Sequence, residues 1–160
     1  MDWLTLAGLT AAVFGAASTG ALFSPGRWYD TLDKPVWTPP NWLFPVAWTF
    51  LYAAMVWAAY RVSGDDADLA TPALAFWTAQ IVFNALWSPV FFGLHRIGSA
   101  LIVLICLWVC VVATTILFFR IDVLAGALFV PYVIWVSYAG ALNAAILRSN
   151  RSRQISEPAS

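Results

Sequence analysis

The sequence predicts an all-α membrane protein, a bundle of five transmembrane helices. Charged residues divide the 160-residue chain into five uncharged stretches, each long enough to cross about 30 Å of hydrocarbon as a helix. Only 10% of the residues are charged, against about a quarter in soluble domains, and 62% are hydrophobic. The joins are short, which favours antiparallel packing of successive helices. We expect one domain, 1–150, with helices at about 3–24, 41–61, 70–94, 97–119 and 123–148.

The first stretch ends in small residues, as a signal peptide does. It lacks a basic start and begins with Asp2, so we interpret it as a retained helix. Small residues recur in it every four positions, at Gly8, Ala12, Ala16 and Gly20. Such a stripe lets another helix approach closely, and it predicts a helix contact either within one chain or between two.

A proline-rich loop leads into the second helix, in the stretch DKPVWTPPNWLFPVAWTFLY (33–52). Three prolines fix φ and withhold N–H donors, which stiffens the loop: Pro35, Pro39 and Pro40. Asn41 or its neighbour is expected to cap the helix. Trp48, Tyr52 and Met55 follow at spacings of four and three, so they share one helix face. A rigid lid beside an aromatic face predicts a binding site for a flat, apolar ligand.

The third stretch carries two amides within the membrane, Gln80 and Asn84, on the same face as Trp87 and Phe91. Unpaired amides are costly in hydrocarbon, so both are expected to point into the bundle. We interpret Gln80 as an interhelical hydrogen-bonding residue, a role worth about 0.6–2 kcal/mol. For Asn84 that role and the orientation of a ligand's polar group stay open. Pro89 is expected to kink this helix.

The fourth stretch is interpreted mainly as a packing helix. Its cysteines, Cys106 and Cys110, have no His, Asp or Glu nearby, so we interpret them as small packing residues and not as a metal or redox pair. In the fifth stretch Trp135, Ala139 and Leu142 fall on one face. The small Ala139 beside Trp135 leaves a hollow, either for another helix or for a ligand.

Ten tryptophans in 160 residues are more than interfacial belts explain. Four suit the membrane–water boundary: Trp3, Trp28, Trp37 and Trp42. Four others fall within spans, where an indole N–H needs a partner or a cavity: Trp48, Trp87, Trp108 and Trp135.

The distribution of Lys and Arg predicts the orientation. One side of the membrane would hold Arg61 and Arg120, and the other Arg27, Lys34, Arg96, Arg148, Arg151 and Arg153. The second side is therefore expected to be cytoplasmic, which places the C-terminus and the first loop there. The polar tail, 151–160, is expected to be disordered.

Several classes of function are disfavoured by what the sequence lacks. It has no Ser–His–Asp set, HExxH motif or phosphate-binding loop, and no span holds a carboxylate. Proton-coupled transporters and ion channels normally keep ionisable groups at mid-membrane. The sole histidine, His95, is interpreted as a loop residue and not as a haem ligand. The net charge is zero, so nucleic acid is not expected as a partner.

Three motifs in order carry a family resemblance: WTPP…F…W…LY (Trp37–Tyr52), Q…FNALWSPVFFG (Gln80–Gly93) and PYVIWVSYAGALN (Pro131–Asn143). They resemble the TspO/MBR family, the tryptophan-rich sensory proteins, whose mitochondrial member is the translocator protein or peripheral benzodiazepine receptor. The resemblance implies a five-helix bundle, commonly a homodimer, that binds tetrapyrroles such as protoporphyrin IX and haem as ligands and requires no cofactor. It also implies binding of cholesterol and of isoquinoline carboxamide or benzodiazepine drugs.

The resemblance further implies a pocket between the first, second, third and fifth helices beneath the first loop. The residues at the matching positions are Trp37, Phe44, Trp48, Tyr52, Asn84, Trp87, Trp135, Ala139 and Leu142. One position departs from the animal members, because Ala144 replaces the tyrosine of a cholesterol-recognition stretch. That departure predicts weak sterol binding and favours a bacterial membrane protein whose ligand is a tetrapyrrole.

Three functions are retained as hypotheses. The leading one is a membrane receptor or regulator that binds tetrapyrroles and helps to control their transport or level, with Arg27 and Lys34 attracting the propionates. The second is light-driven oxidative degradation of bound porphyrin, for which Trp48 and Trp135 are the candidate catalytic residues. The third is a tetrapyrrole or sterol transporter, which the small size and the lack of intramembrane charge disfavour.

Overall fold

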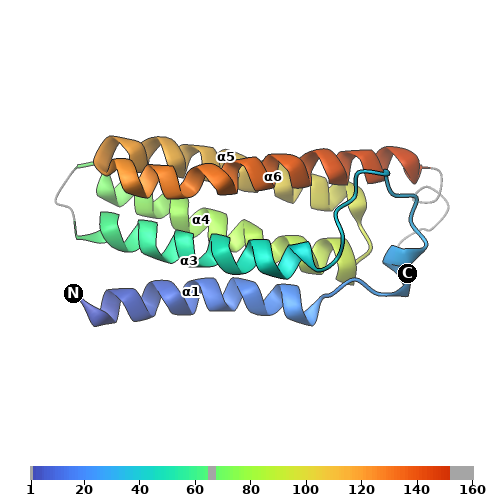
Figure 1. Cartoon of the computed structure of the whole chain (residues 1–160), viewed down its shortest axis with the longest axis horizontal. Helices are drawn as coiled ribbons and strands as arrows, with labels where there is room; N and C mark the ends of the chain where they lie inside the picture. The colour runs from blue at the N-terminus through green and yellow to red at the C-terminus, as the bar shows by residue number, and fades with distance from the viewer. Residues whose placement is uncertain (1, 65–67, 152–160) are drawn as a thin grey trace.

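The computed structural model describes residues 2–64 and 68–151, and five helices in that part are long and apolar enough to cross a membrane. They lie side by side in one bundle, and no strand occurs among the residues described (Figure 1). The predicted fold class is therefore confirmed. The elements are α1 (Trp3–Leu22), α2 (Arg27–Asp30), α3 (Leu43–Ser63), α4 (Ala70–Ser88), the π-helical segment η1 (Pro89–Gly93), α5 (Ile97–Ile121) and α6 (Val123–Ser149).

The five long helices begin and end close to the positions predicted from the uncharged stretches. The start of α3 follows a turn in which the N–H of Leu43 donates to the carbonyl of Pro40 at 3.0 Å. Trp42, the neighbour of Asn41, occupies the cap position without a side-chain hydrogen bond. Most of the tail expected to be disordered, 152–160, lies outside the described residues.

The irregularity predicted at Pro89 takes the form of a π-helical segment. Pro89 has no N–H to donate, so the regular hydrogen-bond ladder of α4 cannot continue through it. The chain widens instead, and the N–H of Leu94 donates to the carbonyl of Pro89, five residues earlier, at 2.9 Å. The widened turn places Phe91 inward, where it is 1% exposed.

The helices do not all pack against their neighbours in sequence. α1 contacts α3 and α4, α4 packs on α5, α5 on α6, and α6 returns to α3. The expectation of sequential packing is wrong at one step, because α3 packs more extensively on α6 than on α4. Trp77 of α4 bridges the two helices: it is buried, and its indole N–H donates to the carbonyl of Met55 on α3 at 3.2 Å.

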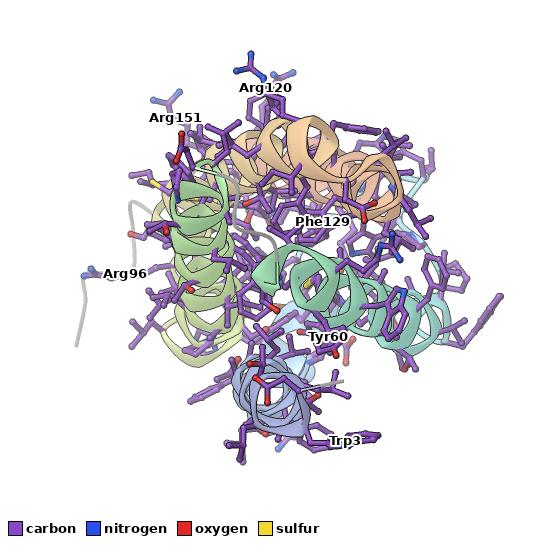
Figure 2. All side chains as sticks on the ribbon, turned by 90° about the vertical axis from the view of Figure 1, so that its left-hand side faces the viewer. Trp3, Tyr60, Arg96, Arg120, Phe129 and Arg151 are labelled. Carbon is purple, nitrogen blue, oxygen red and sulfur yellow. The ribbon has the colours of Figure 1, made fainter. Side chains whose placement is uncertain are left out.

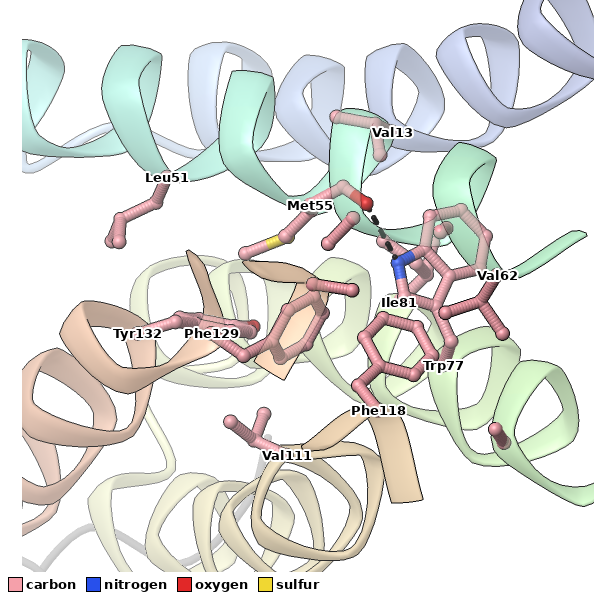
Figure 3. Close-up of a cluster of buried hydrophobic side chains, with 14 of the residues drawn as sticks. Val13, Leu51, Met55, Val62, Trp77, Ile81, Val111, Phe118, Phe129 and Tyr132 are labelled. Carbon is pink, nitrogen blue, oxygen red and sulfur yellow. Dashed lines mark hydrogen bonds between the residues drawn. The ribbon is translucent and has the colours of Figure 1, made fainter. Parts of the chain in front are cut away.

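One end of the bundle, where the C-terminal parts of α3 and α5 meet the N-terminal parts of α4 and α6, is filled by side chains (Figure 3). We call it the packed end and define it by Met55, Ala58, Ala59, Val62, Ala73, Trp77, Val111, Phe118, Ala125 and Phe129, each at most 3% exposed. The rings of Phe118 and Phe129 meet edge to face at 5.0 Å. A view along the bundle shows Phe129 pointing inward, whereas Trp3 and Arg120 point outward (Figure 2).

Polar contacts close the packed end at its surface. The Arg61 side chain donates from Nε to the Asp122 carboxylate at 2.8 Å, which joins α3 to the α5–α6 turn. Asp122 also caps α6 by accepting from the N–H groups of Leu124 and Ala125 at 2.8 and 3.0 Å. Hydrogen bonding to Arg61, and then to these backbone N–H groups, lowers the pKa of the Asp122 carboxyl.

The first loop, 23–42, crosses the opposite end of the bundle. It runs from α1 across to the end of α6 and returns to α3 (Figure 1). The start of α1 and the C-terminal end of α6 lie at opposite ends of the bundle, as an odd number of spans requires. Which end faces the cytoplasm stays a prediction.

Candidate functional site

A cavity of about 620 Å³ lies beneath the first loop, within the range of small-molecule sites in proteins. All five long helices contribute to its walls, together with η1, and Pro25, Tyr29 and Asn41 of the first loop cover it. The described residues that line it include no Asp, Glu, Lys or Arg, and most are aromatic or small and apolar. The site therefore suits a flat, apolar molecule carrying few polar groups.

Aromatic rings from α3 and α6 form one wall. Phe44, Trp48 and Tyr52 are spaced by four residues on α3 and all line the cavity. The Trp48 ring stacks on Tyr52 with centroids 5.1 Å apart, and it meets Trp135 of α6 nearly at right angles at 6.4 Å. Phe44 meets Trp135 edge to face, with ring centroids 5.8 Å apart. These contacts hold each ring in place, so the wall is formed before any ligand arrives.

Small residues make the space that these rings surround. Ala16, Ala17 and Gly20 of α1 line the cavity, and Ala139 of α6 lies on the same side of its helix as Trp135. The hollow predicted beside Trp135 is thus part of the cavity. The small residues of the α1 stripe have different surroundings. Ala16 is buried against the bundle, whereas Gly8 has no neighbouring atom where a Cβ would lie.

A chain of hydrogen bonds forms the polar floor, defined by Tyr52, Asn84, Tyr132 and Gln80. The Tyr52 hydroxyl donates to Asn84 Oδ1 at 3.1 Å, and Asn84 Nδ2 donates to the Tyr132 hydroxyl at 2.9 Å. The Tyr132 hydroxyl in turn donates to Gln80 Oε1 at 2.9 Å. Tyr52 and Asn84 line the cavity, and Gln80 lies behind them, fully buried. Both amides point into the bundle, as predicted.

Two other tryptophans within the spans find hydrogen-bond partners. The indole N–H of Trp87 donates to Asn143 Oδ1 at 3.2 Å, and Asn143 Nδ2 donates to the carbonyl of Ile97, which ties α4, α6 and α5 together. Trp108 donates to the Ser137 hydroxyl at 2.8 Å. By contrast, no hydrogen bond from the Trp48 or Trp135 indole to another described residue is present.

The first loop is fastened to α6 through two side chains. Asn150 is 1% exposed, and its amide accepts from the N–H of Asp33 and donates to the carbonyl of Asp33, both at 3.0 Å. The Tyr138 hydroxyl donates to the carbonyl of Trp37 at 2.6 Å. The lid over the cavity is therefore closed by contacts with the loop backbone.

Two loop residues with predicted roles in ligand binding, Trp37 and Lys34, make contacts outside the cavity lining. Trp37 does not line the cavity: it is 45% exposed, and its ring packs edge-on against Tyr138 at 5.6 Å. The Lys34 ammonium donates to the carbonyl of Tyr29 at 2.9 Å and lies 4.3 Å from the centre of the Tyr29 ring. Lys34 is thus engaged within the loop. Burial raises the pKa of the Tyr29 hydroxyl.

The remaining chemically active side chains lie away from the cavity. His95 is exposed in the turn before α5, with its ring stacked on Trp28 at 4.2 Å. Cys106 and Cys110 are free thiols on α5, of which Cys110 is buried. Within residues 2–64 and 68–151, no three His, Cys, Asp or Glu side chains are grouped so as to hold a metal ion.

Eight of the nine residues implied by the family resemblance line the cavity, and Trp37 alone lies beside it. The sequence did not single out Tyr132, whose mid-span hydroxyl links the two amides, or Asn150, which lies beyond the last predicted span. Leu104 and Leu107 of α5 also line the cavity, although that helix was interpreted as a packing element. Tyr132 could have been identified from the sequence, because a hydroxyl within a membrane span requires a hydrogen-bond partner.

Comparison with known proteins decides the family. The TspO/MBR family model matches residues 4–148. The chain belongs to the TspO/MBR family. It is 48% identical to the tryptophan-rich sensory protein of Cereibacter sphaeroides over 153 residues, which cover 96% of each chain. Protein CrtK of Rhodobacter capsulatus is 57% identical over 137 residues, covering 84% of this chain and 86% of that one. The human translocator protein is 34% identical over 154 residues, covering 92% of this chain and 91% of that one.

Proposed function

We propose that this TspO/MBR family member is an integral membrane receptor that binds tetrapyrroles, such as protoporphyrin IX and haem, and contributes to their transport or level control. The observation that carries the proposal is the cavity of about 620 Å³ beneath a fastened loop, walled by the rings of Phe44, Trp48 and Trp135. A macrocycle is flat and apolar, and aromatic faces and edges provide the contact area it needs. The names of two relatives, a sensory protein and a translocator protein, agree with sensing or translocation as the role.

The direct test is purification of the protein from cells that accumulate porphyrin, followed by absorption spectroscopy. We expect a porphyrin band that stays with the protein through gel filtration, and saturable quenching of tryptophan fluorescence when protoporphyrin IX is added to the ligand-free protein. Non-saturable quenching, equal to that given by empty detergent micelles, would refute the proposal.

A second candidate function is light-dependent oxidation of the bound porphyrin by molecular oxygen. Trp48 and Trp135 favour it, because both indoles line the cavity and neither N–H is engaged by another described side chain or carbonyl. Indole is easily oxidised, whereas phenylalanine keeps a flat face and resists oxidation. Trp48→Phe and Trp135→Phe should therefore slow bleaching of the porphyrin band under illumination in air, compared at equal bound fractions. Bleaching at the native rate in both variants would leave these tryptophans as binding residues only.

The remaining assignments from the family are proposed with it. We propose a homodimer, weak sterol binding because of Ala144, binding of isoquinoline carboxamide or benzodiazepine drugs, and a bacterial membrane location with the C-terminus and first loop cytoplasmic. A cysteine at Ser156, a position outside the described residues, tests the orientation once Cys106 and Cys110 are replaced. Labelling by an impermeant thiol reagent in intact cells would reverse it.

A further inference from the structure

The Ser88 hydroxyl, at the point where α4 passes into η1, has no hydrogen-bond partner among the described residues. Serine and threonine hydroxyls within helices commonly donate to the carbonyl four residues earlier. Those of Thr49 and Ser137 do so here, at 2.8 and 2.7 Å, whereas Ser88 makes no such bond to the carbonyl of Asn84. A hydroxyl in apolar surroundings costs free energy unless it is hydrogen-bonded, so the Ser88 hydroxyl is available to another group.

Ser88 lines the cavity, and the other hydroxyls that the long helices bring there already donate to an acceptor. Those of Tyr52 and Tyr138 donate to Asn84 Oδ1 and to a loop carbonyl, and that of Thr49 donates within α3. Among the described hydroxyls that the long helices contribute to the cavity, Ser88 is thus the one whose proton and oxygen are both without a hydrogen bond.

A gap beside the Ser88 hydroxyl leaves room for a ligand group. Gly20 of α1 also lines the cavity, and a methyl group at this position would lie 3.9 Å from Ser88 Oγ, in ordinary van der Waals contact. The absence of a side chain at Gly20 therefore keeps the space in front of the hydroxyl open. A small polar substituent of a bound molecule can enter this space and reach Ser88 Oγ.

From these observations we infer a specificity subsite for a hydroxyl group on the edge of the ligand, formed by Ser88 and the gap at Gly20. The Ser88 hydroxyl can donate one hydrogen bond and accept others, and a hydroxyl on the ligand can do the same in return. The inference rests on the proposed function and adds the class of tetrapyrrole that is favoured, one whose macrocycle carries a hydroxyalkyl side chain. The described residues that line the cavity include no charged side chain, so this discrimination does not depend on charge.

Haematoporphyrin IX and mesoporphyrin IX are a matched pair of probes for this subsite. They share the macrocycle and both propionates, and two 1-hydroxyethyl groups of the first are ethyl groups in the second. Dissociation constants come from quenching of tryptophan fluorescence in detergent, and the measured quantity is the constant for mesoporphyrin IX divided by the constant for haematoporphyrin IX. Partition of each probe into micelles is the same for every variant, so it cancels when the ratios of two proteins are compared.

Ser88→Ala should lower this ratio by about threefold to tenfold, as the loss of one hydrogen bond gives, mainly by weakening the binding of haematoporphyrin IX. Gly20→Ala should lower the ratio in part, because its methyl group lies in the gap beside Ser88 Oγ. Thr78→Val is the matched control: Thr78 is an exposed residue of α4 whose hydroxyl donates to the carbonyl of Leu74. Its ratio should equal the native one.

The Tyr29 hydroxyl of the lid is the competing source of such discrimination, because it lines the cavity and has no hydrogen bond to another described residue. Tyr29→Phe alters the lid for both probes alike, so the ratio should stay at the native value. A ratio that falls in Tyr29→Phe and stays native in Ser88→Ala assigns hydroxyl recognition to the lid and overturns the inference.

Mesoporphyrin IX reports in every variant whether the cavity has formed, so loss of folding is separated from loss of the subsite. If Ser88→Ala binds neither probe, Gly20→Ala decides: a lowered ratio supports the subsite, and a native ratio overturns it. An unchanged ratio in Ser88→Ala also overturns the inference, and saturable binding of mesoporphyrin IX in the same experiment leaves the proposed function standing. If native protein binds neither porphyrin, the proposed function fails and the subsite fails with it.

Discussion

The two ends of the bundle are built from the same kinds of residue, large aromatic rings beside alanines, and yet one is solid and the other hollow. At the packed end Ala58 and Ala59 of α3 are fully buried, and the space above them is filled by rings such as Trp77 and Phe129. Beneath the first loop, Ala17 of α1 and Ala139 of α6 line the cavity. An alanine thus leaves room at both ends. At the packed end rings from neighbouring helices fill that room, whereas beneath the first loop it stays part of the cavity.

The hydrogen bonding of polar atoms also differs between the two ends. At the packed end the Trp77 indole N–H is satisfied by the backbone carbonyl of Met55. At the hollow end neither the Trp48 nor the Trp135 indole N–H has a hydrogen-bond partner among the described residues, and the polar floor ends at Gln80 Nε2, which is buried without a hydrogen bond. The packed end thus satisfies this indole N–H within the fold, whereas the hollow end leaves polar atoms without a hydrogen bond.

The sharpest test places the same substitution at both ends, beginning with Ala59→Leu. Ala59 is fully buried in the packed end, and added methyl groups have no space there. We expect the free energy of unfolding to fall by about 1–3 kcal/mol, measured by reversible denaturation in detergent. Protoporphyrin IX affinity of the folded fraction should be unchanged, because the cavity lies at the other end. Native-like stability in this variant would show that the packed end is looser than its burial indicates.

Ala139→Leu is the partner experiment in the hollow end. The added atoms enter the cavity beside Trp135, so protoporphyrin IX affinity should fall by about tenfold or more, while the unfolding free energy and the helical circular dichroism change little. Titration of tryptophan fluorescence measures the first quantity and denaturation the second. The comparison breaks down if this variant loses stability as Ala59→Leu does and still binds porphyrin normally.

A smaller effect is expected from Asn150→Ala, which acts on the lid. The substitution removes three side-chain hydrogen bonds, two to the backbone of Asp33 and one to the carbonyl of Ile146. Each is typically worth about 0.5–1.5 kcal/mol, and their loss should raise the dissociation rate of bound porphyrin more than it changes the association rate. Stopped-flow displacement measures both rates. Ser137→Ala, on the outer side of α6, serves as the control and should release porphyrin at the native rate.

The smallest effect concerns pH at the packed end. Arg61 lowers the pKa of the Asp122 carboxyl in the folded protein, so the unfolded chain binds a proton there more readily. The ion pair and the α6 cap therefore stabilise the fold above the unfolded pKa, about 3.9, and this contribution is lost as the pH falls through the folded pKa. Because both side chains are partly exposed, we expect about 1 kcal/mol at most.

Comparing native protein with Asp122→Asn by denaturation at pH 7 and at pH 3 measures that contribution. The difference in unfolding free energy between the two proteins should be present at pH 7 and shrink at pH 3. A difference that is the same at both pH values would mean that the cap and the ion pair do not depend on the charge of Asp122. Porphyrin affinity should not respond to this substitution at neutral pH, since the cavity is at the other end.

The spans could be predicted because charge exclusion and hydrocarbon thickness act on each helix by itself. The aromatic row of α3 and the amides of α4 could be assigned to the inside for the same reason, since helical spacing places them on one face. The order in which the helices meet could not be predicted, because it depends on how side chains such as Trp77 fit between helices, and local spacing in one sequence does not reveal that fit.

Site residues show the same limit. Trp37 and Trp48 are both tryptophans of one motif, but backbone folding of the loop turns Trp37 onto Tyr138 and leaves Trp48 at the cavity. Asn150 lies beyond the last predicted span, and its role depends on a loop that lies 117 positions earlier in the chain. Pairings over such distances depend on tertiary structure, which local spacing does not reveal.

The fastening of the first loop has a consequence for how this protein can change over evolutionary time. Asn150 and Tyr138 hold the loop by its peptide groups, the N–H and carbonyl of position 33 and the carbonyl of position 37. The hydrogen bonds that close the lid thus place no demand on the side chains at these two loop positions, although the Trp37 ring also packs on Tyr138, and proline at position 33 would remove the N–H. Substitutions there can alter the outward surface of the lid, and so the molecules that it meets, while the lid stays shut.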